Sequence, residues 1–144
     1  MAEENKVTEA LEEFGKRELG DVKVLMIEDD PIITDLVTQK LSMSGCIPYS
    51  TLDSTEALKL AEHFQPDVVI LDLMMPKLSG EEIIQAMKAD DNLKNIPILV
   101  FTNKSSDEDM QNVLTLGAAE YLVKASTELN QLVEVVKRLA ASKV

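Results

Sequence analysis

The stretch Val68-Val69-Ile70-Leu71-Asp72 decides the fold of this protein. Four apolar residues stand between the chain-breaking pair Pro66-Asp67 and an acid. A short, fully apolar run of this kind is typical of a strand that is buried on both faces. Such strands occur mainly in parallel sheets, which are covered by helices on both sides. The run therefore predicts a central strand of an α/β domain, with Asp72 at its carboxyl end.

Further strands and helices alternate on both sides of this strand. Apolar runs predict strands over 22–27, 46–50, 96–101 and 120–123, and Pro48 places the second run near a sheet edge. Each strand is followed by a helical pattern that opens on a capping residue, namely Asp30, Asp53, Ser79, Ser105-Ser106 and, for the last helix, Ser126-Thr127. Five β-then-α units predict a flavodoxin-like, doubly wound α/β fold. We expect a five-stranded parallel sheet of order 2-1-3-4-5 with five helices.

The first twenty residues differ from the rest of the chain. Residues 1–20 form an N-terminal extension in which Val7, Ala10, Leu11 and Phe14 recur at helical spacing. The extension is either a short amphipathic helix that docks on the domain or on a partner, or a frayed tail, because isolated helices of this length are marginal in water. Residues 21–144 are predicted to form the single folded domain.

Composition narrows the classes of function. The 144 residues carry a formal net charge of −12, and such a chain repels nucleic-acid backbones and anionic membranes. We therefore expect no direct binding to nucleic acid or to an anionic membrane. A membrane span is not expected either, because no stretch approaches the roughly 18 unbroken apolar residues that it needs. The polar, acidic start is not a secretory signal, and a lone cysteine, Cys46, cannot form an internal disulfide. A cytoplasmic location is the expectation.

Polar side chains follow four of the five predicted strands. Glu28 and Asp29 follow the first strand, Asp72 the third, Thr102 the fourth and Lys124 the fifth. Because parallel strands end at the same edge of a sheet, these side chains are expected to lie together. Clustered, partly desolvated carboxylates repel one another, and a hard divalent cation removes that conflict. The pattern predicts a site for Mg²⁺, or for Mn²⁺.

Such a pocket is suited to phosphoryl transfer. A carboxylate oxygen of Asp72 can attack phosphorus, while a cation, Lys124 and Thr102 share the charge on the phosphoryl oxygens. Little covalent machinery is needed, because this chemistry depends mainly on positioning and electrostatics.

The order and spacing of these residues resemble a known family. The matching motifs are Glu28-Asp29 after a strand, Asp72-Leu73-Met74-Met75-Pro76 with Gly80, then Thr102, and Tyr121-Leu122-Val123-Lys124. Together they resemble the receiver domains of bacterial two-component response regulators over residues 22–139. The resemblance leaves open whether the chain is a stand-alone receiver or a piece of a longer regulator.

The resemblance implies a role for each matching residue. Asp72 would take a phosphoryl group from a phosphohistidine on a sensor histidine kinase or a histidine phosphotransfer protein. Lys124 would hold a phosphoryl oxygen, while Thr102 and Tyr121 would act as the switch. The metal would be held by the carboxylates of Asp29 and Asp72, by Glu28 through water and by the backbone carbonyl of Met74.

The resemblance also implies an output. The fourth helix, last strand and last helix would present a changed surface to a downstream protein, and a phosphorylation-dependent dimer is one option. The domain would be a signalling switch, not an enzyme acting on other substrates.

Two positions depart from the commonest family pattern. Ala125 follows Lys124 where the family usually has a cis proline, so the bond is either strained or trans. We still expect Lys124 to point into the pocket. Asn103 is larger than the small residue usual after Thr102, and we hypothesise that it narrows access to Asp72.

Two other functions are alternatives on the basis of the residues. A Mg²⁺-dependent phosphatase that uses an aspartyl-phosphate usually needs a second acid two residues after its nucleophile, but Met74 occupies that position. A receiver-like interaction module that works without phosphorylation would not need the full set of polar residues. The lone histidine, His63, is interpreted as an exposed helix residue, Cys46 as a packing residue, and the run 105–109 as helix capping.

Overall fold

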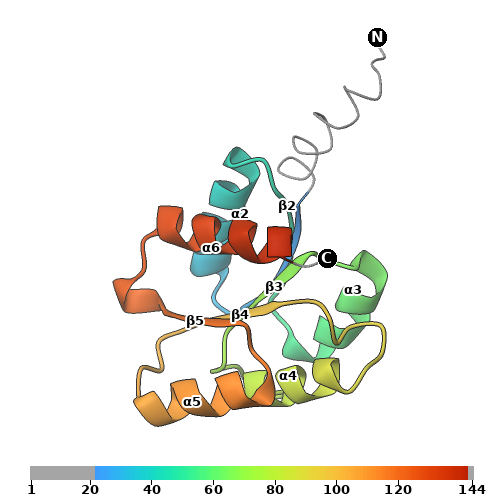
Figure 1. The fold of residues 1–144 in the computed structure, drawn as a ribbon. Helices are drawn as coiled ribbons and strands as arrows, with labels where there is room; N and C mark the ends of the chain where they lie inside the picture. Colours follow the sequence, from blue (N-terminus) through green and yellow to red (C-terminus); the bar gives the residue numbers. More distant parts are fainter. Residues whose placement is uncertain (1–21, 143–144) are drawn as a thin grey trace.

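Figure 1 shows a computed structural model of the chain, and the structure describes residues 22–142. The N-terminal extension 1–20, for which a short helix or a frayed tail was expected, lies outside the described residues. None of the helices in the described part is long and apolar enough to cross a bilayer.

Five parallel strands form one sheet in the order β2-β1-β3-β4-β5. The strands are β1 (Lys23–Ile27), β2 (Ile47–Thr51), β3 (Val68–Leu71), β4 (Ile98–Thr102) and β5 (Glu120–Val123). All four residues of β3 are buried, as expected of a central strand in a sheet that helices cover on both faces. The predicted flavodoxin-like fold and strand order are confirmed.

Five α-helices lie in the described residues, on both faces of the sheet (Figure 1). They are α2 (Pro31–Met43), α3 (Ala57–Phe64), α4 (Gly80–Lys88), α5 (Asp107–Leu116) and α6 (Leu129–Ser142). Short 3₁₀ turns, η1 (Ser54–Glu56) and η2 (Lys124–Ser126), precede α3 and α6. Helices α2 and α6 lie on one face, and α3, α4 and α5 lie on the other.

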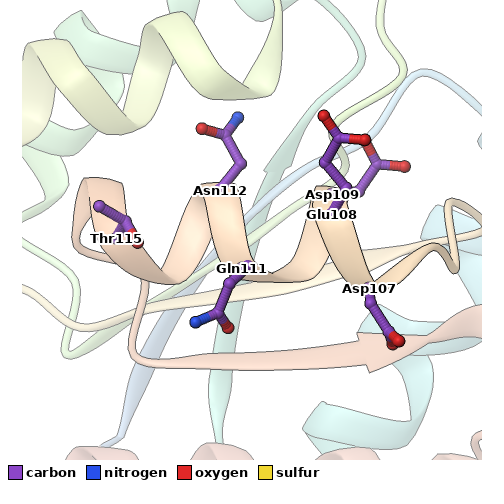
Figure 2. Close-up of a pocket in the computed structure, with 6 residues that line it drawn as sticks. All are labelled: Asp107, Glu108, Asp109, Gln111, Asn112 and Thr115. Atoms are coloured by element: carbon purple, nitrogen blue, oxygen red, sulfur yellow. The ribbon is translucent and has the colours of Figure 1, made fainter.

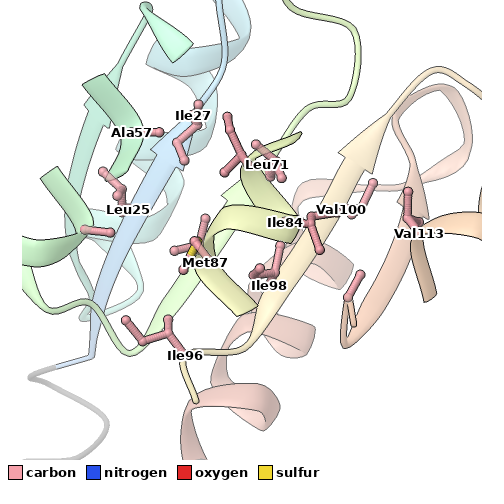
Figure 3. Packing of buried hydrophobic residues seen from close by; sticks show 14 of the residues in the cluster. Leu25, Ile27, Ala57, Leu71, Ile84, Met87, Ile96, Ile98, Val100 and Val113 are labelled. Atoms are coloured by element: carbon pink, nitrogen blue, oxygen red, sulfur yellow. The ribbon is translucent and has the colours of Figure 1, made fainter. Parts of the chain in front are cut away.

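Alternate strand residues point to opposite faces and build two cores. Leu25 and Leu71 belong to the cluster under α3, α4 and α5, which Figure 3 shows from close by. Met26 and Ile70 belong to the second cluster, under α2 and α6. The sheet is therefore buried from both sides, and its carboxyl edge is where polar side chains can collect.

Most predicted helix starts are confirmed by their caps. The side chain of Asp30 accepts a hydrogen bond from the Ile32 amide at 2.9 Å, and Ser79 and Glu82 form a reciprocal capping box. Ser106 accepts from the Asp109 amide at 3.0 Å and caps α5. These caps fix the helices that begin next to the carboxyl ends of the strands.

Two predicted helix caps were wrong. The expected capping box at 53–56 does not form, because the Glu56 carboxylate accepts from the Thr51 hydroxyl, at 3.3 Å, and Asp53 caps the 3₁₀ turn instead. The last helix was expected near Ser126-Thr127 but begins at Leu129. The Thr127 hydroxyl bonds back to the Val123 carbonyl at 2.7 Å, so it closes the turn η2 and does not cap α6.

Candidate functional site: an acidic pocket at the carboxyl edge of the sheet

The two acids that end the central strands lie side by side. Ile27 of β1 pairs with Leu71 of β3, so Glu28 and Asp72 follow paired positions on neighbouring strands. The Asp72 amide donates to the Ile27 carbonyl at 3.1 Å, which extends the ladder by one bond. Asp29 completes the group, and one carboxylate oxygen from each of the three lies within 4.8 Å of the others.

Lys124, which directly follows the edge strand β5, reaches this acidic group. Its ammonium nitrogen Nζ lies 2.6 Å from Glu28 Oε1 and 3.1 Å from Asp72 Oδ2. The Lys124 side chain is only 12% exposed, so both ion pairs are shielded from solvent. The expected orientation of Lys124 into the pocket is confirmed. All peptide bonds in the described residues are trans, including the bond to Ala125.

Burial and neighbouring charge shift the titration of this pair. Burial raises the pKa of the Glu28 carboxyl, and the nearby Asp72 charge adds to the rise, while the hydrogen bond from Lys124 opposes it. Burial alone would lower the pKa of Lys124, but its bonds to the two carboxylates outweigh this and raise that pKa. Lys124 therefore stays protonated, and its single positive charge neutralises only part of the negative charge of the three carboxylates.

The residues present fit a hard divalent cation. The buried ammonium group of Lys124 pairs with Glu28 and Asp72, while Asp29 adds a third carboxylate to the cluster. Asp29 is exposed and the other two acids are buried, so the cluster is open on one side. Apart from the ion pair with Lys124, no hydrogen bond from the described residues reaches the buried Oε1 of Glu28. Oxygen donors with an open side suit Mg²⁺, which keeps several waters when bound.

Met74 lies at the rim of the pocket. Its amide donates to Asp72 Oδ1 at 3.2 Å, and the residue as a whole is 56% exposed.

Thr102 and Tyr121 are linked through the loop after β4. Thr102 is fully buried at the end of β4, and its hydroxyl oxygen accepts from the Lys104 amide at 3.4 Å. Tyr121 is buried too, and its hydroxyl donates to the Lys104 carbonyl at 2.7 Å. Burial raises the pKa of Tyr121, and the charges of Asp109, Glu81 and Asp72 add to this effect. The burial of Tyr121 and the bond from its hydroxyl to Lys104 show that the ring points inward in this structure.

Two interactions near the pocket involve residues that the sequence did not single out. Lys104 Nζ lies 3.7 Å from Glu81 Oε2 on α4. Ser54 is 1% exposed and bonds to the loop between β3 and α4. Neither pair shows a signal in the sequence, because the partners are far apart along the chain and meet only through loop conformations.

The structure agrees with the structural interpretation of His63 and Cys46. His63 is exposed in the last turn of α3, and Cys46 is buried. Figure 2 shows a hollow along α5 lined by Asp107, Glu108, Asp109, Gln111, Asn112 and Thr115. All six lie on one helix and none belongs to the acidic pocket.

Asn103 is exposed, and its proposed narrowing of access to Asp72 stays a prediction.

Comparison with known proteins identifies the family. The family described as "Response regulator receiver domain" matches residues 24–137. The DNA-binding dual master transcriptional regulator RpaA of Synechocystis is 36% identical over 102 residues, which are 71% of this chain and 42% of that protein. The alkaline phosphatase synthesis transcriptional regulatory protein PhoP of Bacillus subtilis is 35% identical over 118 residues, 81% of this chain and 48% of that protein.

Solved structures show the same architecture. The chemotaxis protein CheY4 of Vibrio cholerae is 31% identical with a TM-score of 0.76, and the match covers 82% of this chain and 98% of that one. The receiver domain of the Francisella response regulator 1452 is 28% identical with a TM-score of 0.77, over 83% of this chain and 96% of that one.

This chain belongs to the response regulator receiver domain family of two-component systems. It spans 42% and 48% of the length of the two curated relatives named above. Receiver domains are signalling switches, and the relatives are transcriptional regulators from bacteria.

Proposed function

We propose that this domain is a phosphoacceptor switch in which Asp72 takes a phosphoryl group from a phosphohistidine. The observation that supports this most strongly is the position of Asp72 next to a buried cation and close to two other acids. Lys124 Nζ lies 3.1 Å from Asp72 Oδ2, and Glu28 and Asp29 bring their oxygens within 4.8 Å of Asp72. Packing alone does not require three clustered acids at the end of a buried strand.

The proposed reaction forms one bond and breaks another. A carboxylate oxygen of Asp72 attacks phosphorus, and the phosphorus–nitrogen bond to the donor imidazole breaks. The imidazole nitrogen keeps the electron pair and takes up a proton. Lys124 holds one oxygen of the transferred group, and the Thr102 hydroxyl can donate to another after it moves towards the pocket.

The proposed metal ligands are Asp29 and Asp72, with Glu28 acting through water and Met74 through its backbone carbonyl. Bound Mg²⁺, or Mn²⁺, would neutralise the charge that builds up on the phosphoryl oxygens. Glu28 and Lys124 would then keep the carboxylates oriented for the ion.

The proposed output is a change of surface on α5, β5 and α6. Thr102 and Tyr121 are both bonded to Lys104, on the loop that leads into α5. A movement of Thr102 towards a phosphoryl group would therefore change the contacts of this loop and of Tyr121. A downstream protein, or a second copy in a phosphorylation-dependent dimer, would read the change.

The kinase-side partner would be a sensor histidine kinase or a histidine phosphotransfer protein. The location that fits such partners is the cytoplasm, and residues 21–144 would form the receiver after the extension 1–20. The alternatives, a receiver-like module without phosphorylation and an aspartyl-phosphate phosphatase, have weaker support. For the phosphatase, the residue two positions after Asp72 is Met74, which has no acid or base.

The test is incubation with acetyl phosphate and Mg²⁺, followed by intact mass measurement. We expect the wild-type chain to gain one phosphoryl group that is stable in acid and lost in base. Asp72→Asn should gain none, while Asp91→Asn, on an exposed acid, serves as the matched control and should behave as wild type. A gain that survives Asp72→Asn, or no gain in wild type, would refute the proposal.

A further inference from the structure

Ser54 is a buried polar residue outside the acidic pocket. It opens η1, on the connection between β2 and α3, and is only 1% exposed. Its hydroxyl donates to the Pro76 carbonyl at 2.9 Å and accepts from the Leu78 amide at 3.1 Å. Both groups belong to the loop that runs from Asp72 to α4. One hydroxyl therefore bridges the two backbone groups that flank Lys77.

The bridged residue has a disfavoured backbone conformation. Lys77 has a φ of +70°, in the left-handed region that residues with a Cβ atom rarely adopt. Such a conformation persists only where the surroundings hold it. The Ser54 bonds lie directly on either side of Lys77, and its ammonium is 3.6 Å from Asp53 Oδ2. That ion pair is largely exposed and contributes little, whereas the two hydrogen bonds come from a buried hydroxyl.

The base of the same loop is held by Gly80. Its amide donates to the Leu73 carbonyl at 3.3 Å. A Cβ atom at Gly80 would lie 2.7 Å from the Leu73 Cα and 2.8 Å from the Asp72 carbonyl oxygen, so only glycine fits this approach. The loop is therefore fixed at its base by Gly80 and at its tip by Ser54, and Met74 lies between the two restraints.

We propose that Ser54 is a positioning residue that places the Met74 carbonyl for metal binding. The inference rests on the proposed function, because the Met74 carbonyl is one of its proposed ligands. Without the Ser54 hydroxyl, the Pro76 carbonyl and the Leu78 amide lose a buried partner. Lys77 can then relax out of its left-handed conformation. The backbone after Met74 loses its restraint at the loop tip, while the Met74 amide keeps its bond to Asp72 Oδ1. The three carboxylates are untouched, so metal binding weakens but is not abolished.

The test compares Ser54→Ala with a matched control, Ser44→Ala. The Ser44 hydroxyl also donates to a backbone carbonyl, that of Lys40 at 2.8 Å, but at the end of α2, which is opposite to the pocket. The dissociation constant for Mg²⁺ is measured on the full chain by following backbone amide signals in an NMR titration. Ser54→Ala should raise it about three- to tenfold, the range that a lost hydrogen bond predicts, and Ser44→Ala should leave it within about twofold.

Amide hydrogen exchange in the metal-free chain gives a second readout. Ser54→Ala should speed exchange at Leu78, whose amide loses its acceptor, and Ser44→Ala should not. If Ser54→Ala does not fold, Ser54→Cys keeps the shape with a weaker hydrogen-bonding group and is judged by the same limits.

The outcomes separate this inference from the proposed function. Unchanged Mg²⁺ affinity in Ser54→Ala, or an equal loss in Ser44→Ala, overturns the role of Ser54 even when Asp72 is phosphorylated normally. A wild-type chain that binds Mg²⁺ but accepts no phosphoryl group refutes the proposed function, and the comparison of Mg²⁺ affinities still decides the role of Ser54.

Discussion

Replacing Lys124 with methionine should destabilise the metal-free protein in a pH-dependent way. The methionine keeps most of the side-chain volume but removes the charge that lies 2.6 Å from Glu28 and 3.1 Å from Asp72. The Glu28 and Asp72 side chains are only 2% and 6% exposed, so water cannot replace the lost cation. Breaking a buried pair in this way typically costs about 3–5 kcal/mol.

Protonation of Glu28 limits this cost. Burial already raises the pKa of Glu28 above its ordinary value of 4.5, and loss of Lys124 raises it further. In the unfolded chain the carboxyl titrates at its ordinary value of 4.5. Relative to that state, holding the proton at pH 7 costs about 1.36 kcal/mol for each of the roughly 2.5 pH units above 4.5, or about 3.4 kcal/mol. At pH 5 the same step costs about 0.7 kcal/mol. Because the folded state of the variant binds more protons than the unfolded state, its stability falls as the pH rises from 5 to 7.

Urea unfolding at pH 5 and pH 7, without divalent cations, measures the effect. We expect Lys124→Met to lose about 3 kcal/mol relative to wild type at pH 7 and about 1 kcal/mol or less at pH 5. Lys94→Met is the matched control, since Lys94 pairs with Asp91 on the surface, and it should stay within about 0.5 kcal/mol at both pH values. A Lys124→Met protein as stable as wild type at pH 7, or a loss that does not depend on pH, would refute the electrostatic account of the pocket.

Three further predictions concern neighbouring residues. Gly80→Ala places a Cβ atom 2.7 Å from the Leu73 Cα and should lower the free energy of unfolding by about 1–3 kcal/mol, measured by urea denaturation; no loss would contradict the close approach. Asp72→Asn removes one charge from the acidic cluster and should weaken Mg²⁺ binding at least about tenfold in calorimetry, so equal affinity would argue against Asp72 as a ligand. Tyr121→Phe leaves the Lys104 carbonyl without its donor and should lower the free energy of unfolding by about 1–1.5 kcal/mol. Because the pKa of Tyr121 is raised, the variant should also lose a tyrosine that titrates above the ordinary range in ultraviolet absorbance. Persistence of that titration would contradict the assignment.

The sheet and the acidic pocket could be predicted from the sequence for the same reason. Apolar runs mark the strands, and parallel strands end at one edge, so the residue after each run is placed without knowledge of any loop. Asp72 follows β3 and Glu28 follows β1, and the register of Ile27 with Leu71 brings them together as expected. Lys124 could be placed in the same way, although it comes from the far edge strand.

Interactions that depend on loop conformation could not be predicted. The bonds from Ser54 to Pro76 and from Tyr121 to the Lys104 carbonyl join residues 22 and 17 positions apart through irregular backbone. The capping errors have a related cause, because hydroxyls and carboxylates can bond in either direction along the chain. Thr127 bonds back to Val123 and Glu56 to Thr51, so these residues do not cap the helices that follow them.

The most direct test of the account asks which carboxylate carries the phosphoryl group. Protein phosphorylated with acetyl phosphate and Mg²⁺ is reduced with borohydride, which converts a phosphorylated aspartate to homoserine, and the peptides are mapped by mass spectrometry. The account predicts homoserine at position 72 alone, and none when Mg²⁺ is replaced by a chelator. Modification at Asp29 or at any other acid in place of Asp72 would contradict it.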